Sequence, residues 1–386
     1  MRHTLRVVGV VPVAASLLLA SCGGDDGPSA DDKREVVEHY AAGVHAAYGA
    51  SLASATELDL AIRAFADDPT QATMDAAKQA WLAARNDYGL TEAFRFYGGP
   101  IDDEETGPEG QINAWPLDEA YIDYVDGDET AGIINAVDQY PTIDAELITS
   151  LNEEGGEANI SSGWHAIEFL LWGQDLSDSG PGERPVTDYT EDEQAQRRMT
   201  YLTVASMQLL DDLTSMADAW APDADNYRAA FVEREPDEAL TDIITGIGFL
   251  TRGELANERM NVAYEARSQE DEHSCFSDNT NADLVANELG IRMVLTGAYP
   301  GAEGPGVMAL FEAADEQVAT DLTASVDDAV GALEAIPAPF DQHLADGVPD
   351  DDPGRAAVLD GINALDAQAD RIIAAADALG LTIITA

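Results

Sequence analysis

Residues 359–380 read LDGINALDAQADRIIAAADALG, and this stretch indicates most plainly how the chain folds. Apolar residues recur in it at steps of three and four, the period of an α-helix with one buried face. The recurring positions are Leu359, Ile362, Leu365, Ala369, Ile372, Ala376 and Leu379. Gly380 follows as a helix stop. Similar periodicity runs through nearly the whole chain, without convincing alternating strand patterns, so we expect an all-α protein built from helical bundles.

Two long irregular segments, 98–114 and 173–190, interrupt the helical pattern. Structureless loops of this length in a compact domain are usually functional or disordered. A softer break lies between Pro222 and Pro236. We therefore expect an N-terminal helical bundle over residues 33–230 and a C-terminal helical bundle over 231–386.

The N-terminus indicates export. Residues 1–22 have a short basic start and an apolar run, and end Leu-Ala-Ser-Cys, which resembles a bacterial lipobox with Cys22 as the lipidated residue. The alternative is an ordinary signal peptide whose cysteine is incidental. Residues 23–32 are small, polar and acidic, as in a flexible tether. We expect an extracytoplasmic protein anchored through Cys22, at the outer membrane or on the periplasmic face, with the outer membrane favoured if the cell has one.

The charge of the chain is strongly negative. It carries 74 Asp and Glu against 19 Lys and Arg, a formal net charge of −55. Because phosphates would be repelled, we expect no nucleic-acid partner. Two interpretations remain open for the excess of acids. It is common in proteins adapted to saline environments, and it could also concentrate cations near a metal site.

Residues 163–173, GWHAIEFLLWG, place His165 and Glu168 three residues apart at the start of an apolar helix. Positions i and i+3 share a helix face, so the two side chains can converge on a divalent metal. Ser161 or Ser162 can cap this helix, whose dipole favours a neutral imidazole. Two ligands do not make a site, since a zinc hydrolase takes three protein ligands plus water. The alternative is a purely structural pair.

Residues 81–92 carry a second set of polar side chains on a helix face. Trp81, Arg85, Tyr88 and Glu92 follow one another at steps of four, three and four. The arginine stem could simply pack on the aromatic rings with its head in water. Alternatively, Arg85 and Glu92 point into a cleft, where the guanidinium could hold a carboxylate. The sequence leaves both possibilities open.

The segment NAWPLDE at 113–119 could begin a helix, which would explain Asp118 by the helix dipole, or it could leave Asp118 free as a metal ligand. Trp115 in the same segment is a candidate for ligand binding.

In 251–280, Glu254 and Glu258 step along one helix face, and Arg259 stands in the adjacent apolar stripe, where it needs carboxylate partners. Beyond them, Asp271 and His273 are possible ligands, although a solvated helix end would also explain them.

Four ordered motifs together resemble the imelysin family, over essentially the whole mature chain. They are WLAARNDYGLTEAFRFY at 81–97, INAWPLDEAYIDYV at 112–125, GWHAIEFLLWGQD at 163–175, and GELANERM at 253–260 with EDEHSCFSD at 270–278. The resemblance implies two helical-bundle domains with a cleft between them, lined by the G-x-H-x-x-E segment. It also implies an extracytoplasmic lipoprotein tied to iron acquisition, and the family carries a peptidase label.

These observations favour a lipoprotein of iron uptake that binds a metal ion, or a metal-bearing ligand, at the domain interface. Iron is the expected metal and zinc the alternative. The expected metal ligands are His165, Glu168, Glu92, Asp118 and Asp271. The expected ligand-binding residues are Arg85, Arg259, Trp115, Glu254, Glu258 and His273. An oxygen-rich shell of this kind suits iron better than a thiolate shell would. An iron transporter or receptor would be a natural partner.

Two other functions stay open from sequence. A metallopeptidase would use His165 and Glu168, with Glu168 as the catalytic carboxylate, but it would need a third zinc ligand and the chain has no H-E-x-x-H motif. A haem- or protein-binding module would use the motif only for packing. We expect binding rather than catalysis.

Overall fold

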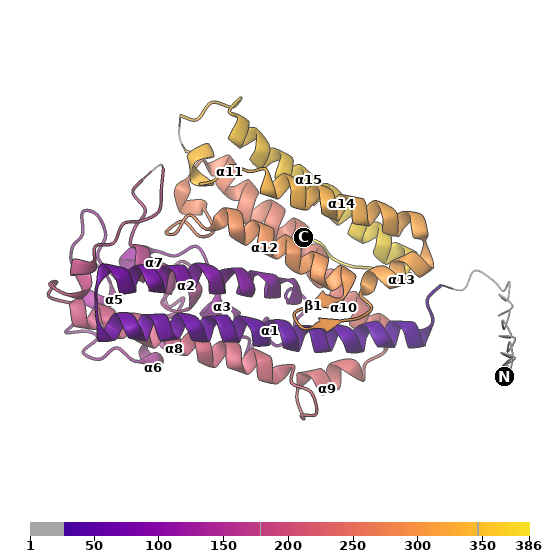
Figure 1. Cartoon of the computed structure of the whole chain (residues 1–386), viewed down its shortest axis with the longest axis horizontal. Helices are drawn as coiled ribbons and strands as arrows, with labels where there is room; N and C mark the ends of the chain where they lie inside the picture. Colours follow the sequence, from indigo (N-terminus) through magenta and orange to yellow (C-terminus); the bar gives the residue numbers. More distant parts are fainter. Residues whose placement is uncertain (1–26, 178, 346) are drawn as a thin grey trace, which may run out of the picture.

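The computed structural model describes residues 27–177, 179–345 and 347–386, and it is helical almost throughout (Figure 1). The α-helices are α1 (Ala30–Asp67), α2 (Gln71–Gly89), α3 (Glu109–Ile112), α4 (Glu119–Ile122), α5 (Gly132–Asn135), α6 (Ala145–Leu151), α7 (Gly163–Trp172), α8 (Ala195–Ala219), α9 (Tyr227–Val232), α10 (Pro236–Phe249), α11 (Val262–Ala266), α12 (Thr280–Thr296), α13 (Val307–Ala314), α14 (Glu316–Glu334) and α15 (Pro353–Ala378). The 3-10 helices are η1 (Leu90–Phe94), η2 (Val186–Tyr189), η4 (Gln269–Asp271) and η5 (Asp341–His343), and η3 (Leu250–Asn261) is a π-helix. The all-α prediction is confirmed.

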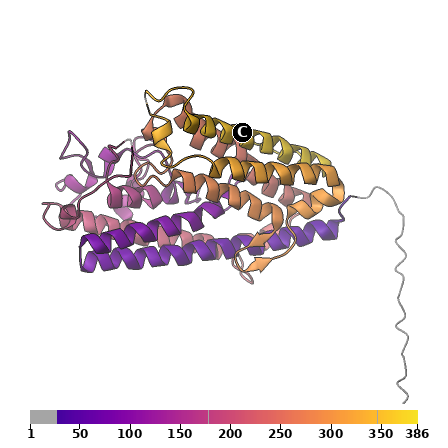
Figure 2. The same ribbon diagram turned by 45° about the horizontal axis from the view of Figure 1, so that its top comes forward.

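The strands of the described residues form one antiparallel hairpin of β1 (Ala298–Tyr299) and β2 (Ala302–Glu303), which lies against α1 (Figure 2). None of the described helices is both long enough and apolar enough to cross a membrane. The predicted signal (1–22), with Cys22, lies outside the described residues. Residues 30–32 of the predicted tether already belong to α1, because Ser29 and Asp32 form a capping box at its start.

The long helices pack in two groups that share an extensive contact. Helices α1, α2 and α8 run side by side, and η3, α12, α14 and α15 form the second group (Figures 1 and 2). Helix α12 packs on α2 and η1, and α10 packs on α1. The predicted domain boundary between residues 230 and 231 falls inside α9, so the division into two domains stays a prediction.

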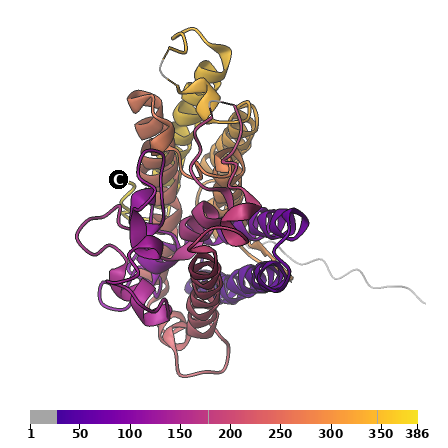
Figure 3. The same ribbon diagram turned by 90° about the vertical axis from the view of Figure 1, so that its left-hand side faces the viewer.

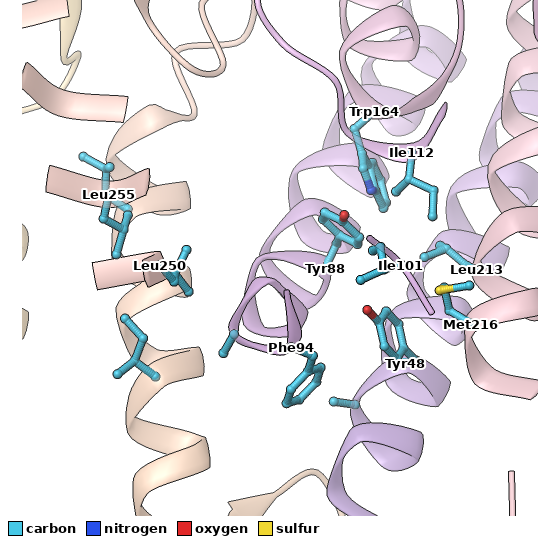
Figure 4. Close-up of a cluster of buried hydrophobic side chains, with 14 of the residues drawn as sticks. Tyr48, Tyr88, Phe94, Ile101, Ile112, Trp164, Leu213, Met216, Leu250 and Leu255 are labelled. Carbon is cyan, nitrogen blue, oxygen red and sulfur yellow. The ribbon is translucent and has the colours of Figure 1, made fainter. Parts of the chain in front are cut away.

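Buried apolar side chains hold the helices together. In Figure 4, Tyr88 and Trp164 lie next to each other, with Ile112 and Phe94 nearby. Trp81 also packs edge-on against Trp164, and its indole nitrogen donates to the Trp164 carbonyl oxygen at 3.1 Å. Burying these large rings favours folding through the hydrophobic effect. The aromatic contacts also fix α7 against α2, and thereby set the position of the histidine motif.

Many of the irregular segments between α2 and α8 lie at the end of the long helices that faces the viewer in Figure 3. A buried ion network fixes part of them: Asp123 accepts from Arg184 at 2.7 Å and from Arg198 at 2.6 Å. Arg184 follows α7 and Arg198 belongs to α8. A buried carboxylate is tolerated when it is paired and hydrogen-bonded in this way. The segment 173–190 is therefore tied to the helical body.

Candidate functional site

The motif helix α7 begins at a position that only glycine suits. Gly163 has φ +81°, and a Cβ there would lie 2.3 Å from the Ile112 carbonyl oxygen. The predicted serine cap is wrong: the Ser161 hydroxyl donates to Ile148 O at 2.6 Å, and the Ser162 hydroxyl donates to Gln111 O at 2.9 Å. Both serines tie the start of α7 to neighbouring segments instead. Every residue of α7 is buried.

His165 and Glu168 meet as their spacing predicts. The Nδ1 atom of His165 lies 2.9 Å from Oε2 of Glu168. The other oxygen of Glu168 accepts two hydrogen bonds from Ser277, one from its backbone N–H at 2.9 Å and one from its hydroxyl at 2.7 Å. The remaining ring nitrogen of His165, Nε2, is buried and has no hydrogen-bond partner. A carboxylate that fixes one nitrogen and leaves the other open is typical of metal-binding histidines.

His273 repeats this arrangement beside the first pair. Its Nδ1 lies 2.8 Å from Oδ2 of Asp283, a residue of α12, and its ring centroid lies 5.0 Å from that of His165. The Nε2 atom of His273 lies 3.3 Å from a guanidinium nitrogen of Arg85. Because arginine only donates, Nε2 of His273 is the acceptor and its Nδ1 carries the proton. Trp115 packs edge-on against the same imidazole.

Burial controls the protonation of these groups. It lowers the pKa of His165 well below its usual value, and the positive charge of Arg85 lowers it further. Burial and the charge of Arg259 do the same for the pKa of His273. Burial also raises the pKa of Glu168 to about 8, although the hydrogen bonds from Ser277 oppose the change. Both imidazoles are therefore neutral near pH 7, which is the state that can coordinate a metal, and Glu168 is largely protonated there, so a metal that bound His165 would release this proton.

A second buried network adjoins the histidines and is centred on Glu92 of η1. Its carboxylate accepts from Asn113 at 2.8 Å, from Arg95 at 3.0 Å and from Arg259 at 3.0 Å. Burial alone would raise the pKa of Glu92, but Arg259, Arg95 and Arg85 outweigh it, so the pKa lies well below its usual range. Asn113 also accepts from Arg85 and so connects this network to His273. Glu92 is thus an ionised structural centre rather than a free ligand.

The π-helix η3 explains which acid pairs with Arg259. Hydrogen bonds in a π-helix run over five residues rather than four, so Glu254 comes to lie beside Arg259. Glu254 accepts from Arg259 at 3.0 Å, whereas Glu258 is exposed and accepts from the neighbouring Asn257. The two acids therefore differ in their surroundings, since Glu254 is half-buried against Arg259 and Glu258 is exposed.

The other predicted residues take different places. Trp115 is half-buried and its indole nitrogen donates to the Glu272 carbonyl oxygen at 2.8 Å. Asp118 is exposed and caps α4, accepting from the Ala120 N–H at 3.1 Å, so the capping alternative holds. Asp271 is half-buried at the end of η4. These positions do not place Asp118 with the buried histidines.

Sequence reasoning missed several residues of the site. Asn113, Asp283, Asn287 and Ser277 all complete the buried network, and Asn287 accepts from Arg259. Asp283 and Asn287 stand four residues apart in an otherwise largely apolar helix, a signal that could have identified them. Asn113 and Ser277 gave no comparable signal, because their partners lie far away in the sequence.

Potential metal ligands come closest together elsewhere. Within the part of the chain that the structure describes, the one set of three histidine, cysteine or acidic ligand atoms within 4.8 Å of one another belongs to Asp175, Asp278 and Asp341. Residues 173–177 and 179–185, which include Asp175, also line a cavity of about 1070 Å³, together with Lys78, Tyr124 and Trp172. None of these three acids was among the predicted site residues.

Comparisons with known proteins agree on one family. The family model described as Imelysin matches residues 44–372. Iron-regulated protein A of Synechococcus elongatus is 27% identical over 340 residues, which cover 84% of this chain and 80% of that protein.

Two solved structures share the fold. A protein described as an iron-regulated protein A precursor from Parabacteroides distasonis has a TM-score of 0.68 at 18% identity, covering 90% of this chain and 96% of its own. An imelysin-like protein from Psychrobacter arcticum has a TM-score of 0.66 at 15% identity, covering 92% and 98%. The Imelysin model matches most of the length of this chain, which shows that the chain belongs to the imelysin family.

Proposed function

We propose that this protein serves iron acquisition outside the cytoplasm and binds iron, or a small iron-bearing ligand, at His165. The observation that carries the proposal is the buried, unpartnered Nε2 of His165, whose other nitrogen is fixed by Glu168. A second imidazole held by a carboxylate lies 5.0 Å away. The similarity to iron-regulated protein A supports iron as the cargo, with zinc as the alternative metal.

The roles within the site follow from these contacts. His165 would bind the metal through Nε2. Glu168 would orient the imidazole ring through Nδ1 and would not be the first group to bind the metal. His273 would become a second ligand once Arg85 releases its Nε2. Arg85 and Arg259 would then hold an anionic group that accompanies the metal. Because His165 is buried, the cluster must open before cargo enters.

Binding is favoured over hydrolysis for a geometric reason. A zinc peptidase centre needs three protein ligands and an open fourth position. Even with His273 released from Arg85, His165 and His273 supply two imidazoles, and Glu92 is committed to three donors. These groups are arranged to hold one another in place, not to activate water. In this proposal a lipid on Cys22 anchors the protein to the membrane, and a membrane transporter or receptor for iron is its partner.

Metal titration of the purified mature chain tests this function. Fe(II) under anaerobic conditions, ferric citrate and Zn(II) are each titrated into the wild type and into His165→Ala, Glu168→Gln and His45→Ala. His45 is a matched control, because its Nδ1 lies 3.0 Å from the Ala217 carbonyl oxygen, away from the site.

We expect His165→Ala to abolish tight iron binding and Glu168→Gln to weaken it about 10- to 100-fold, while His45→Ala binds like the wild type. Indistinguishable isotherms for His165→Ala and the wild type would refute the proposal.

A further inference from the structure

A cavity of about 1070 Å³ lies where α7 ends beside α2 (Figure 1). Trp172, the last residue of α7, and Lys78 of α2 both line it, whereas His165 does not. Trp172 follows His165 by seven positions, which is two helical turns or about 10 Å along the axis. The cavity is thus separate from the histidine cluster, and its volume suits a small molecule.

Lys78 brings an ammonium group to this cavity. Its Nζ atom lies 5.3 Å from the centre of the Trp172 ring, and within the described residues it has neither a hydrogen bond nor a carboxylate in salt-bridge contact. Burial lowers the pKa of Lys78, the charge of Asp75 opposes this change, and the charge of Arg184 adds to it. An anion placed beside Nζ would offset the cost of keeping the buried amine charged.

Arg184 supplies a second donor that lacks an acceptor. This residue lines the cavity and is only 5% exposed. One terminal nitrogen of its guanidinium donates to Asp123 and Asp188, but its buried Nε has no hydrogen-bond partner. Gly173 also lines the cavity and places no side chain beside this donor, since a Cβ there would lie 3.5 Å from Nε. Buried donors are normally paired with protein, water or a ligand, so Nε indicates an acceptor supplied from outside the chain.

The acids that line the cavity do not satisfy these donors. Asp126 and Glu183 are exposed, where water screens their charge. Asp175 is buried and already accepts a hydrogen bond from a glutamine of η4. The remaining charged groups of the cavity, Lys78 and Arg184, are both cationic and both keep a donor without an acceptor.

We propose that this cavity binds a small organic anion that carries more than one carboxylate, with Lys78 as its main contact and Nε of Arg184 as a second donor. An ammonium pairs with a carboxylate as a point charge, and a guanidinium donates in a fixed direction, so the two groups can hold separate carboxylates. An inorganic anion would fill only a small part of the cavity, which favours an organic one. The proposal does not depend on iron at His165, because it uses different residues.

Calorimetric titration of the metal-free mature chain with citrate tests the site, with acetate and phosphate as comparison anions. Potassium chloride at about 0.5 M screens the long-range repulsion from the rest of the chain, whereas a partly buried contact is screened much less.

The variants are Lys78→Met, Lys78→Arg and Lys33→Met. Methionine keeps an apolar stem on Trp172 without the charge. Lys33 is a matched control, because it is the only other lysine, is also half-buried, and pairs with Asp237 at 2.6 Å away from the cavity.

We expect one citrate to bind the wild type and Lys33→Met, and binding to Lys78→Met to weaken about tenfold or more, with most of the affinity restored in Lys78→Arg. Acetate and phosphate should bind more weakly than citrate. Thermal unfolding of Lys78→Met should match that of the wild type, since no ion pair is lost. Equal citrate binding by Lys78→Met and the wild type would overturn the proposal, and so would a wild type that binds phosphate more tightly than citrate or binds no citrate.

Amine acetylation of the wild type locates the anion without any substitution. Mass spectrometry follows the rates at which Lys33 and Lys78 are acetylated. Citrate should slow the acetylation of Lys78 and leave that of Lys33 unchanged; the same effect on both lysines, or none on Lys78, would contradict the site. His165→Ala should bind citrate as the wild type does, so this proposal and the iron proposal can fail separately.

Discussion

Replacing Glu288 with glutamine should stabilise the protein, and increasingly so as the pH rises. Glu288 of α12 is fully buried and accepts from the Gln368 amide of α15 at 2.9 Å. Burial raises its pKa from an ordinary value of 4.5 to about 8. The folded state therefore keeps a proton that the unfolded chain loses as the pH rises through 4.5. The free energy of unfolding therefore falls as the pH rises from 4.5 to about 8, and above the pKa of the folded state it falls no further on account of Glu288.

The size of the effect follows from the two pKa values. Each tenfold change in an equilibrium corresponds to about 1.4 kcal/mol, so the interval from 4.5 to about 8 corresponds to roughly 5 kcal/mol. Glutamine keeps the acceptor oxygen and carries no charge at any pH. The variant should match the wild type near pH 4.5 and exceed it by up to roughly 5 kcal/mol above pH 8.

Urea unfolding, followed by circular dichroism at several pH values, measures this difference. Glu334→Gln, at the exposed end of α14, serves as the control. Because the two proteins compared differ by at most one charge, the large net charge of −55 affects both alike. If the difference in the free energy of unfolding between Glu288→Gln and the wild type stays constant with pH, Glu288 does not have a raised pKa in the folded protein.

Three further predictions concern the site and the surface. Arg259→Met removes a cation that pairs with Glu92, so the free energy of unfolding measured in urea should fall by about 3–5 kcal/mol. A fall of less than about 1 kcal/mol would contradict a stabilising role for this ion pair. Gly163→Ala should lower the melting temperature far more than Gly155→Ala. Both glycines have a positive φ, but only a Cβ at position 163 would lie 2.3 Å from a backbone oxygen, so equal melting temperatures would contradict this prediction. The net charge of −55 should make the melting temperature rise with potassium chloride, and a flat salt dependence would argue against surface repulsion.

Helices could be predicted where one face is buried along its whole length. In α15, Ile362, Leu365 and Ile372 are buried as the periodicity predicts. Leu359 is 40% exposed instead, and Val358 takes its place in the buried stripe. Such a shift at a helix end follows from neighbouring helices, which the local pattern does not contain. The π-helix around Arg259 was not predicted, because the local pattern of apolar residues does not reveal its wider turn, in which Arg259 pairs with Glu254 five positions away.

The candidate site was predictable only where its contacts are local. The spacing of His165 and Glu168 brought the two together as expected. Their partners, Ser277 and His273, come from more than 100 residues away, and no helical period relates such positions. Asp118 looked like a possible ligand because the sequence alone cannot distinguish a capping carboxylate from a coordinating one.

Iron binding at His165 is tested most directly by locating iron in crystals of the mature chain. Crystals grown anaerobically with Fe(II) would be measured at the iron absorption edge. We expect an anomalous peak about 2 Å from Nε2 of His165, with the Glu168 carboxyl group still on Nδ1. An iron peak on Asp175, Asp278 and Asp341 with none at His165 would contradict it.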